Sequence, residues 1–252
     1  MGDATDDQDA LFSLLGQVKA VLFDFDGPIC ALFAGRPTTS VADAIKRTAR
    51  EVWECDFLSP EVELCDDSHD ILRLLRGMYE SAPDKLSPLP LKAAEAKVAD
   101  AEAEAVETAE PAPHIDVLLP LLAGLGKRLA IVSNNAAGPI RVFLKRSDVR
   151  LDAEFSGVFG RNPDDARLMK PHPDCVERAV EDLSLTASEC LLVGDKISDF
   201  EAARKAGTRF LGYAQDAHRI EEMKTSGAEV VVASHDRVIA VARKLRADRQ
   251  AL

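Results

Sequence analysis

Short apolar runs alternate with longer segments of helical periodicity along this 252-residue chain, and this alternation constrains its fold most. The runs are rich in β-branched residues and only four to six residues long, so each predicts a buried strand. The five runs lie at residues 18–23, 128–132, 190–193, 208–213 and 228–232. Helical patterns fall near 114–124, 136–147, 173–183, 199–206 and 235–246. We therefore expect an α/β fold, a three-layer sandwich whose parallel sheet is covered by helices on both faces.

The segment from 31 to 111 breaks this alternation, because it contains no convincing buried strand. Its last helical stretch is rich in Ala and Glu, which are strong helix formers. The stretches lie near 40–54, 67–81 and 91–109. We predict a helical cap domain inserted after the first strand, with residues 1–30 and 112–252 forming the core and 31–111 the cap. The alternative is that these helices pack directly on the sheet.

The charge balance limits the partners of the chain. Its formal net charge is −12, and such a surface repels nucleic acid, whose binding depends on neutralising phosphates with Lys and Arg. No stretch approaches the ~20 apolar residues of a membrane span, and the N-terminus is acidic where a signal peptide is basic. The five cysteines include no C-x-x-C pair, which argues against structural zinc. We expect a cytoplasmic monomer or homodimer that binds neither nucleic acid nor membrane.

Polar side chains follow several of the predicted strands directly. In an open parallel sheet, ligands bind at the carboxyl ends of the strands, so these residues are the candidates for chemistry. The candidates after strands are Asp24, Asp26, Gly27, Ser133, Asn134, Asp195 and Asp199, and Lys170 precedes a helix. We expect these groups to converge on one edge of the sheet.

Three of these residues would bring carboxylates into one pocket, namely Asp24, Asp195 and Asp199. Like charges held that close are unfavourable unless a cation intervenes. Carboxylate oxygens suit Mg²⁺, which also binds water and substrate phosphate. Lys170 adds a positive charge that could orient Asp24 and neutralise a phosphate oxygen.

Two further residues suit phosphate binding. Ser133 offers a hydroxyl and a backbone N–H as donors, and Gly27 lets the chain turn sharply beside the site. Magnesium, a lysine, a hydroxyl and backbone amides together would offset the charge that spreads over a transferring phosphoryl group. The pattern therefore favours phosphoryl transfer.

Four short motifs, in order along the chain, resemble those of the haloacid dehalogenase (HAD) superfamily. They are Asp24-Phe25-Asp26-Gly27, Ser133 after Ile131-Val132, Lys170-Pro171, and Gly194-Asp195 with Asp199. One such motif would be weak, but four in order make a strong signal that covers most of the chain. The resemblance implies a Rossmann-like core and a Mg²⁺-dependent phosphatase of the phosphoglycolate phosphatase-like subgroup, acting on a small phosphorylated metabolite.

The resemblance also implies a role for each acidic residue. Asp24 would attack phosphorus and form an aspartyl-phosphate. Asp26 would protonate the leaving group and then deprotonate the attacking water. Mg²⁺ would be held by Asp24, the backbone carbonyl of Asp26 and Asp195. Asp199 would bind the metal through water or position Lys170.

On the phosphate side, the resemblance implies that Ser133 grips the phosphate with help from Asn134. The insert at 31–111 matches the position of the helical cap that closes over small substrates in one subgroup. The chain departs from the family pattern at Pro28, where Thr is usual. This departure affects the hinge into the cap and the choice of substrate, and it removes no group that phosphoryl transfer needs.

Three other activities share parts of this pattern. A phosphoglucomutase-like enzyme has the same fold and nucleophile but returns the phosphoryl group to a sugar. A haloacid dehalogenase is disfavoured, because dehalogenases lack the second aspartate, present here as Asp26. A catalytically silent phosphate-binding regulatory protein is free to lose Asp24, Lys170 and Asp195, and this chain retains them.

Overall fold

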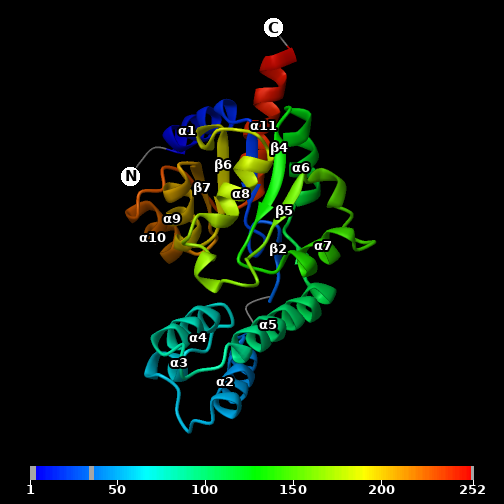
Figure 1. The fold of residues 1–252 in the computed structure, drawn as a ribbon. Coiled ribbons are helices and arrows are strands. Elements are labelled where there is room, and N and C mark those ends of the chain that lie inside the picture. Colours follow the sequence, from blue (N-terminus) through cyan, green and yellow to red (C-terminus); the bar gives the residue numbers. More distant parts are fainter. Residues whose placement is uncertain (1–3, 34–36, 251–252) are drawn as a thin grey trace.

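The computed structural model describes residues 4–33 and 37–250, and its centre is a parallel sheet. The strands are β1 Ala20–Phe23, β4 Arg128–Val132, β5 Gly157–Phe159, β6 Cys190–Gly194, β7 Arg209–Tyr213 and β8 Val231–Val232. They form one six-stranded sheet in the order β5-β4-β1-β6-β7-β8, and all neighbours are parallel (Figure 1). The expected α/β fold is confirmed.

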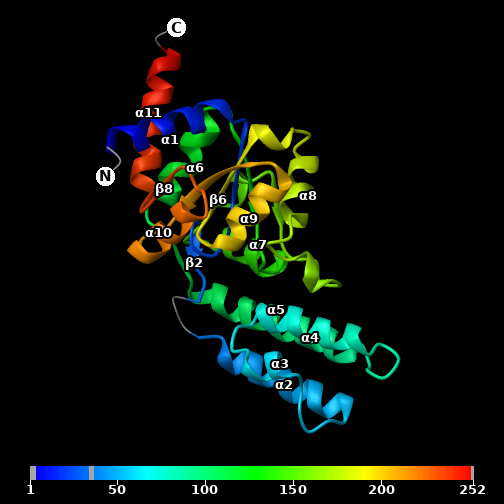
Figure 2. The same ribbon diagram turned by 90° about the vertical axis from the view of Figure 1, so that its left-hand side faces the viewer.

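Helices cover both faces of the sheet. On one face lie α1 Ala4–Gln17, α6 Ile115–Gly124, α7 Ala137–Lys145 and α11 His235–Gln250, and on the other α8 Asp174–Asp182, α9 Ile197–Ala206 and α10 Ala217–Thr225. Successive strand residues point to opposite faces, so Val21 and Phe23 join the first apolar layer and Ala20 and Leu22 the second. Figure 2 shows α1, α6 and α11 on one side of the sheet and α8 on the other.

Three elements of this core were not expected from the sequence. The first strand is preceded by α1, which buries Leu11, Leu14 and Leu15 and for which the sequence analysis predicted no helix. β5 is three residues long, too short to show a periodicity. α10 is polar and buries only Met223, so its sequence resembles a loop.

The segment after β1 forms a helical unit that lies apart from the sheet. Its helices are α2 Thr39–Trp53, α3 Pro60–Leu64, α4 Asp70–Ser81 and α5 Leu89–Thr108. The chain leaves the core at β2 Cys30–Ala31 and returns at β3 Glu110–Pro111, and these two short strands pair antiparallel. The four helices have an apolar cluster of their own, which includes Ile45, Ile71 and Leu75 (Figures 1 and 2). We call this unit the helical insert.

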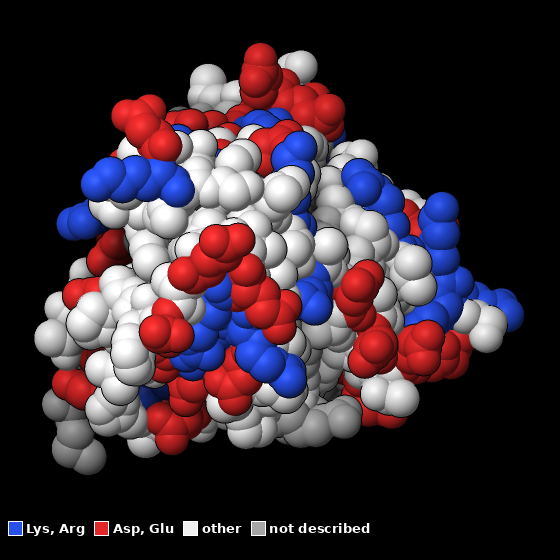
Figure 3. Space-filling model, turned by 60° about the horizontal axis from the view of Figure 1, so that its bottom comes forward, with Lys and Arg blue, Asp and Glu red and all other residues white. Residues whose placement is uncertain are grey.

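The helical insert contacts the core along one side. Arg76 of α4 donates to the carbonyl of Asp164 at 3.1 Å, and Glu80 pairs with Arg167 at 2.9 Å. Met169, which precedes Lys170, belongs to the apolar cluster of the insert. Figure 3 brings this end of the molecule forward, and it shows Lys and Arg side chains interspersed with Asp and Glu. None of the described helices is long and apolar enough to span a membrane.

Candidate active site

The polar residues identified in the sequence meet where three neighbouring strands end. Asp24 follows β1, which pairs with β4 on one side and β6 on the other. Ser133 follows β4, and Asp195 follows β6. The chain builds the β4 side of the sheet first and then crosses to β6, and such a reversal of strand order opens a crevice at the carboxyl ends of the strands. The topology therefore brings these three side chains together.

A buried lysine neutralises part of an acidic cluster at this point. Oxygens of Asp24, Asp195 and Asp199 lie within 4.8 Å of one another. The Nζ of Lys170 lies 2.9 Å from Asp24 Oδ1 and 2.6 Å from Asp199 Oδ1, and it also donates to the carbonyl of Val132 at 3.2 Å. Burial alone would lower the pKa of Lys170, but Asp199 and Asp24 outweigh it and raise the pKa above its ordinary value. Lys170 is therefore charged.

Asp195 is the member of the cluster that lacks a full set of partners. Its Oδ2 pairs with Arg219 Nη1 at 3.1 Å, whereas its buried Oδ1 has no hydrogen-bond partner among the described residues. Burial, and then the charges of Asp24 and Asp199, raise the pKa of Asp195 to about 7. A buried carboxylate oxygen without a donor, beside two further carboxylates, fits a hard divalent cation.

Asp199 is held on both of its oxygens. Oδ1 pairs with Lys170, and Oδ2 accepts the backbone N–H of Lys196 at 3.0 Å at the start of α9. Of the two roles expected for Asp199, this arrangement favours the positioning of Lys170.

Asp26 and Gly27 line a cavity between the core and the helical insert. Its volume is about 430 Å³, and its wall includes His69 from the insert and Lys196 from the core. Asp26 Oδ1 accepts the backbone N–H of Leu32 at 2.9 Å. Burial raises the pKa of Asp26 more than the charge of Lys196 lowers it, so its carboxyl binds a proton more readily than an exposed one.

Ser133 and Asn134 lie at the site, but their hydrogen bonds differ from those expected. The N–H of Ser133 donates to the carbonyl of Phe159 at 3.0 Å, and its hydroxyl donates to Asn135 Oδ1 at 3.0 Å. Asn134 pairs with the backbone of Lys170, accepting its N–H at 2.7 Å and donating to its carbonyl at 3.1 Å. Both ends of the Asn134 amide are therefore engaged by the backbone of Lys170. We infer that Asn134 positions Lys170, and its expected contact with phosphate stays a prediction.

Sequence reasoning missed much of the cavity wall, including the three basic side chains Lys196, Arg219 and His69. Lys196 directly follows Asp195, so its position beside the acidic cluster was visible in the motif itself. Arg219 comes from α10 and His69 from the helical insert, and no local pattern distinguishes either from an exposed residue. Only the packing of distant segments brings them to the cavity.

Comparisons with known proteins agree with this geometry. A model of the haloacid dehalogenase-like hydrolases matches residues 18–207. An uncharacterised hydrolase of Saccharomyces cerevisiae is 25% identical over 193 residues, which cover 77% of this chain and 76% of the yeast protein. The phosphoglycolate phosphatase of Escherichia coli is 30% identical over 122 residues, covering 48% of this chain and 47% of that enzyme. The chain thus matches about half the length of that relative.

Solved structures share the fold. A crystal structure described as a predicted phosphatase from Clostridium acetobutylicum aligns with a TM-score of 0.62 at 19% identity, over 88% of this chain and 97% of that one. The fold and the site define a three-layer α/β protein with an acidic centre at the carboxyl ends of its strands. The family match covers most of the chain and all four motifs, so the chain belongs to the haloacid dehalogenase-like hydrolases. The resemblance seen in the sequence is confirmed.

Proposed function

We propose that this HAD-type phosphatase removes phosphate from a small phosphorylated metabolite through an aspartyl-phosphate on Asp24, with Mg²⁺ as cofactor. One observation carries the proposal. Asp24 lies 2.9 Å from a buried lysine and beside a buried Asp195 oxygen that has no donor. This combination of an oriented carboxylate and an acidic cluster that can hold a cation serves a phosphoryl group, which carries charge on several oxygens.

The carboxylate of Asp24 is oriented for attack. Its Oδ1 accepts from Lys170 Nζ at 2.9 Å and from the N–H of Phe25 at 2.7 Å, which holds the group in one position. Asp24, the backbone carbonyl of Asp26 and Asp195 would hold Mg²⁺, which would neutralise charge on the phosphoryl oxygens. The Asp24 oxygen forms a bond to phosphorus as the bond from phosphorus to the leaving oxygen breaks.

Asp26 moves the proton in both halves of the reaction. Its carboxyl lines the cavity where the leaving group would lie, and its raised pKa favours the protonated form that a general acid needs. It gives its proton to the leaving oxygen. It then accepts a proton from water, whose oxygen attacks phosphorus and breaks the bond to Asp24, releasing phosphate and the free enzyme.

The helical insert suits the role of a cap over a small substrate. Residues 31–111 supply one wall of the cavity, including His69, Thr38 and Asp67, and the core supplies the other. A volume of about 430 Å³ suits a small metabolite. The similarity to a phosphoglycolate phosphatase supports this substrate class, and it covers too little of that enzyme to name the substrate.

Intact-mass measurement after a brief incubation with an aryl phosphate and Mg²⁺ tests this assignment. Asp26→Asn should gain one phosphoryl group, because an aryl leaving group departs without a proton and no base then activates water. Asp24→Asn should gain none. Phosphorylation of the Asp24→Asn variant, or its normal turnover, would overturn the proposed nucleophile.

A further inference from the structure

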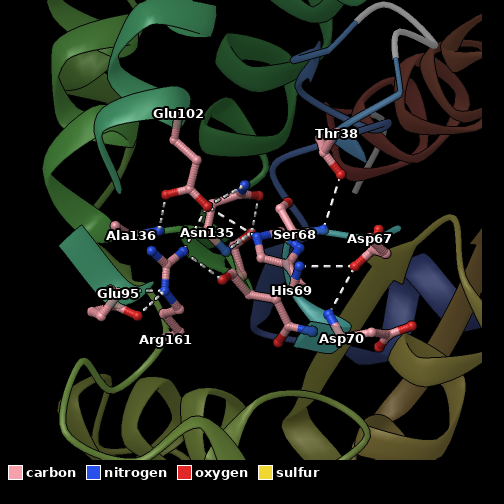
Figure 4. Close-up of polar contacts among 12 residues, drawn as sticks. Thr38, Asp67, Ser68, His69, Asp70, Glu95, Glu102, Asn135, Ala136 and Arg161 are labelled. Carbon is pink, nitrogen blue, oxygen red and sulfur yellow. Dashed lines mark hydrogen bonds and ion pairs between the residues drawn. The ribbon is translucent and has the colours of Figure 1, made fainter. Parts of the chain in front are cut away.

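A buried carboxylate of the helical insert contacts three separate segments of the protein. Glu102, on α5, is fully buried. Its Oε1 accepts from His69 Nε2 at 2.9 Å, Asn135 Nδ2 at 3.0 Å and Arg161 Nη1 at 2.6 Å. Its Oε2 accepts the N–H of Ala136 at 2.9 Å. Figure 4 shows these groups converging from the insert and the core.

This set of donors keeps Glu102 ionised. Burial would raise its pKa, but the hydrogen bond from His69 and the charge of Arg161 outweigh burial and lower the pKa. The negative charge also lies at the N-terminus of α7, where Ala136 has no side chain that could cap the helix. A buried carboxylate with this many partners is strongly held in one position.

Two of these four contacts, from Asn135 and Ala136, reach the loop that follows β4, residues 133–136, which we call the Ser133 loop. Arg161 strengthens the link: its Nη1 also donates to the carbonyl of Asn134 at 3.1 Å, and its N–H donates to the carbonyl of Asn135 at 3.1 Å. Glu95, on α5 as well, holds the other side of the Arg161 guanidinium at 2.8 Å. The helical insert thus binds the Ser133 loop through charged groups.

The hydrogen bond between Glu102 and Asn135 also affects the position of the Ser133 hydroxyl. A carboxylate can only accept hydrogen bonds, so the end of the Asn135 side chain that faces Glu102 must be its NH₂ group. The Asn135 oxygen then faces Ser133 and accepts its hydroxyl at 3.0 Å, while the Asn135 N–H donates to Ser133 Oγ at 3.2 Å. Glu102 therefore sets the orientation of Asn135, and Asn135 sets the place of Ser133 Oγ.

The other partner of Glu102 faces the substrate cavity from the insert. His69 lines that cavity together with Asp26, and a positive charge on its ring would lower the pKa of Asp26. Its Nε2 is held by Glu102 at 2.9 Å, which fixes the plane of the ring. One carboxylate thus holds His69, which lines the cavity, and, through Asn135, the Ser133 hydroxyl at the end of β4.

We propose that Glu102 is a positioning residue that ties the two walls of the active site together, fixing the Ser133 loop on the core and the His69 ring on the insert. The inference rests on the proposed function and on the expectation from the sequence that Ser133 holds the phosphate. The phosphate site is then complete only while the helical insert is seated on the core.

The proposal is tested by the kinetics of the Glu102→Gln variant. They are measured with p-nitrophenyl phosphate and Mg²⁺, at temperatures where the variant is folded. Mispositioning of groups at a reacting centre costs about 10- to 100-fold, so kcat/KM should fall by that factor. Inhibition by inorganic phosphate should weaken, since phosphate needs the Ser133 loop. In a Ser133→Ala background, Glu102→Gln should add less than about threefold, because residues that act through one another are not additive. The matched control is Glu104→Gln, an exposed position on the same helix, which should match wild type.

The outcomes separate the two proposals. Wild-type protein that hydrolyses no aryl phosphate would overturn the proposed function and this inference with it. An active wild type with unchanged kinetics and phosphate inhibition in Glu102→Gln, or with fully multiplicative effects in the double variant, would overturn the inference alone. Should Glu102→Gln fail to fold, Asn135→Ala cuts only the link to Ser133 and keeps the pair of Glu102 with Arg161. Asn135→Ala should lower kcat/KM by the same factor and add little in the Ser133→Ala background. An unchanged kcat/KM, or a fully multiplicative effect, would equally contradict the proposal.

Discussion

Gly27 lies against Asp195 so closely that a Cβ on residue 27 would stand 2.7 Å from the Asp195 Cγ, in a backbone with φ of +107°. Gly27→Ala should therefore displace the Asp195 carboxylate, and the Mg²⁺ concentration for half-maximal activity should rise by about 10-fold or more. Gly126→Ala is the matched control, because its φ is +73° and nothing lies within 4 Å of its Cβ position. It should cost about 1 kcal/mol of strain and leave the Mg²⁺ dependence unchanged. Equal Mg²⁺ dependence in both variants would contradict the metal role of Asp195.

Magnesium should stabilise the folded protein through the same carboxylate. A ligand that binds only the native state adds about 2.7 kcal/mol to the free energy of unfolding at 100 times its dissociation constant. Thermal unfolding of wild type should therefore shift upward with Mg²⁺, and EDTA should abolish activity. Asp195→Asn should lose the shift and nearly all activity, and without metal it should be at least as stable as wild type, because one of three crowded carboxylates becomes neutral. Full activity in EDTA would contradict the assignment of Asp195 as a Mg²⁺ ligand.

Asn134 should affect turnover more than phosphate binding. Its side chain holds the backbone of Lys170 at 2.7 and 3.1 Å, so Asn134→Ala should let the ammonium shift away from Asp24. We expect kcat to fall by about 10- to 100-fold, while the inhibition constant of inorganic phosphate changes little. Weakened phosphate inhibition with an unchanged kcat would instead restore the role of phosphate ligand that the sequence suggested.

His235 should make stability depend on pH below neutrality. Its buried Nε2 lies 2.8 Å from the carbonyl of Pro28, which only accepts, so this nitrogen carries a hydrogen, and the ring stacks on Tyr213. Burial lowers the pKa of His235 below its ordinary value of 6.5. As the pH falls below 6.5, the unfolded chain binds a proton that the folded protein does not, so the free energy of unfolding should drop.

The drop amounts to at most about 1.4 kcal/mol per pH unit, and it ends at the folded pKa. Denaturant unfolding of His235→Gln, which keeps an N–H donor for Pro28, should show a shallower slope between pH 6.5 and 5. His218→Gln, at an exposed position on α10, should keep the slope of wild type. Identical slopes in wild type and His235→Gln would show that folding does not lower the pKa of His235.

The elements that carry the catalytic motifs were predictable from the sequence because their signals are local. A run such as Val21-Leu22-Phe23 can be buried on both faces only inside a covered parallel sheet, and a carboxylate just after it must lie at the strand end. Asp24 and Asp195 follow from this logic, whereas Lys170 was identified from the resemblance of Lys170-Pro171 to a family motif. Very short or polar elements, such as β5 and α10, lack a periodicity and were missed.

The partners of the individual polar residues in the site depend on tertiary contacts. The Ala- and Glu-rich stretch of α5 contains Glu95, Glu102 and Glu104 in nearly identical local sequence settings. Of these three, only Glu102 is fully buried and accepts hydrogen bonds from four donors. Asn134, the residue after Ser133, bonds the backbone of a lysine 36 positions away, a contact that no local pattern indicates. The sequence by itself determined the fold class and the acidic centre, since apolar periodicity and strand-end position are properties of short segments. Only the tertiary structure decided which polar side chains meet, because a hydrogen bond depends on the relative placement of segments that lie far apart in the chain.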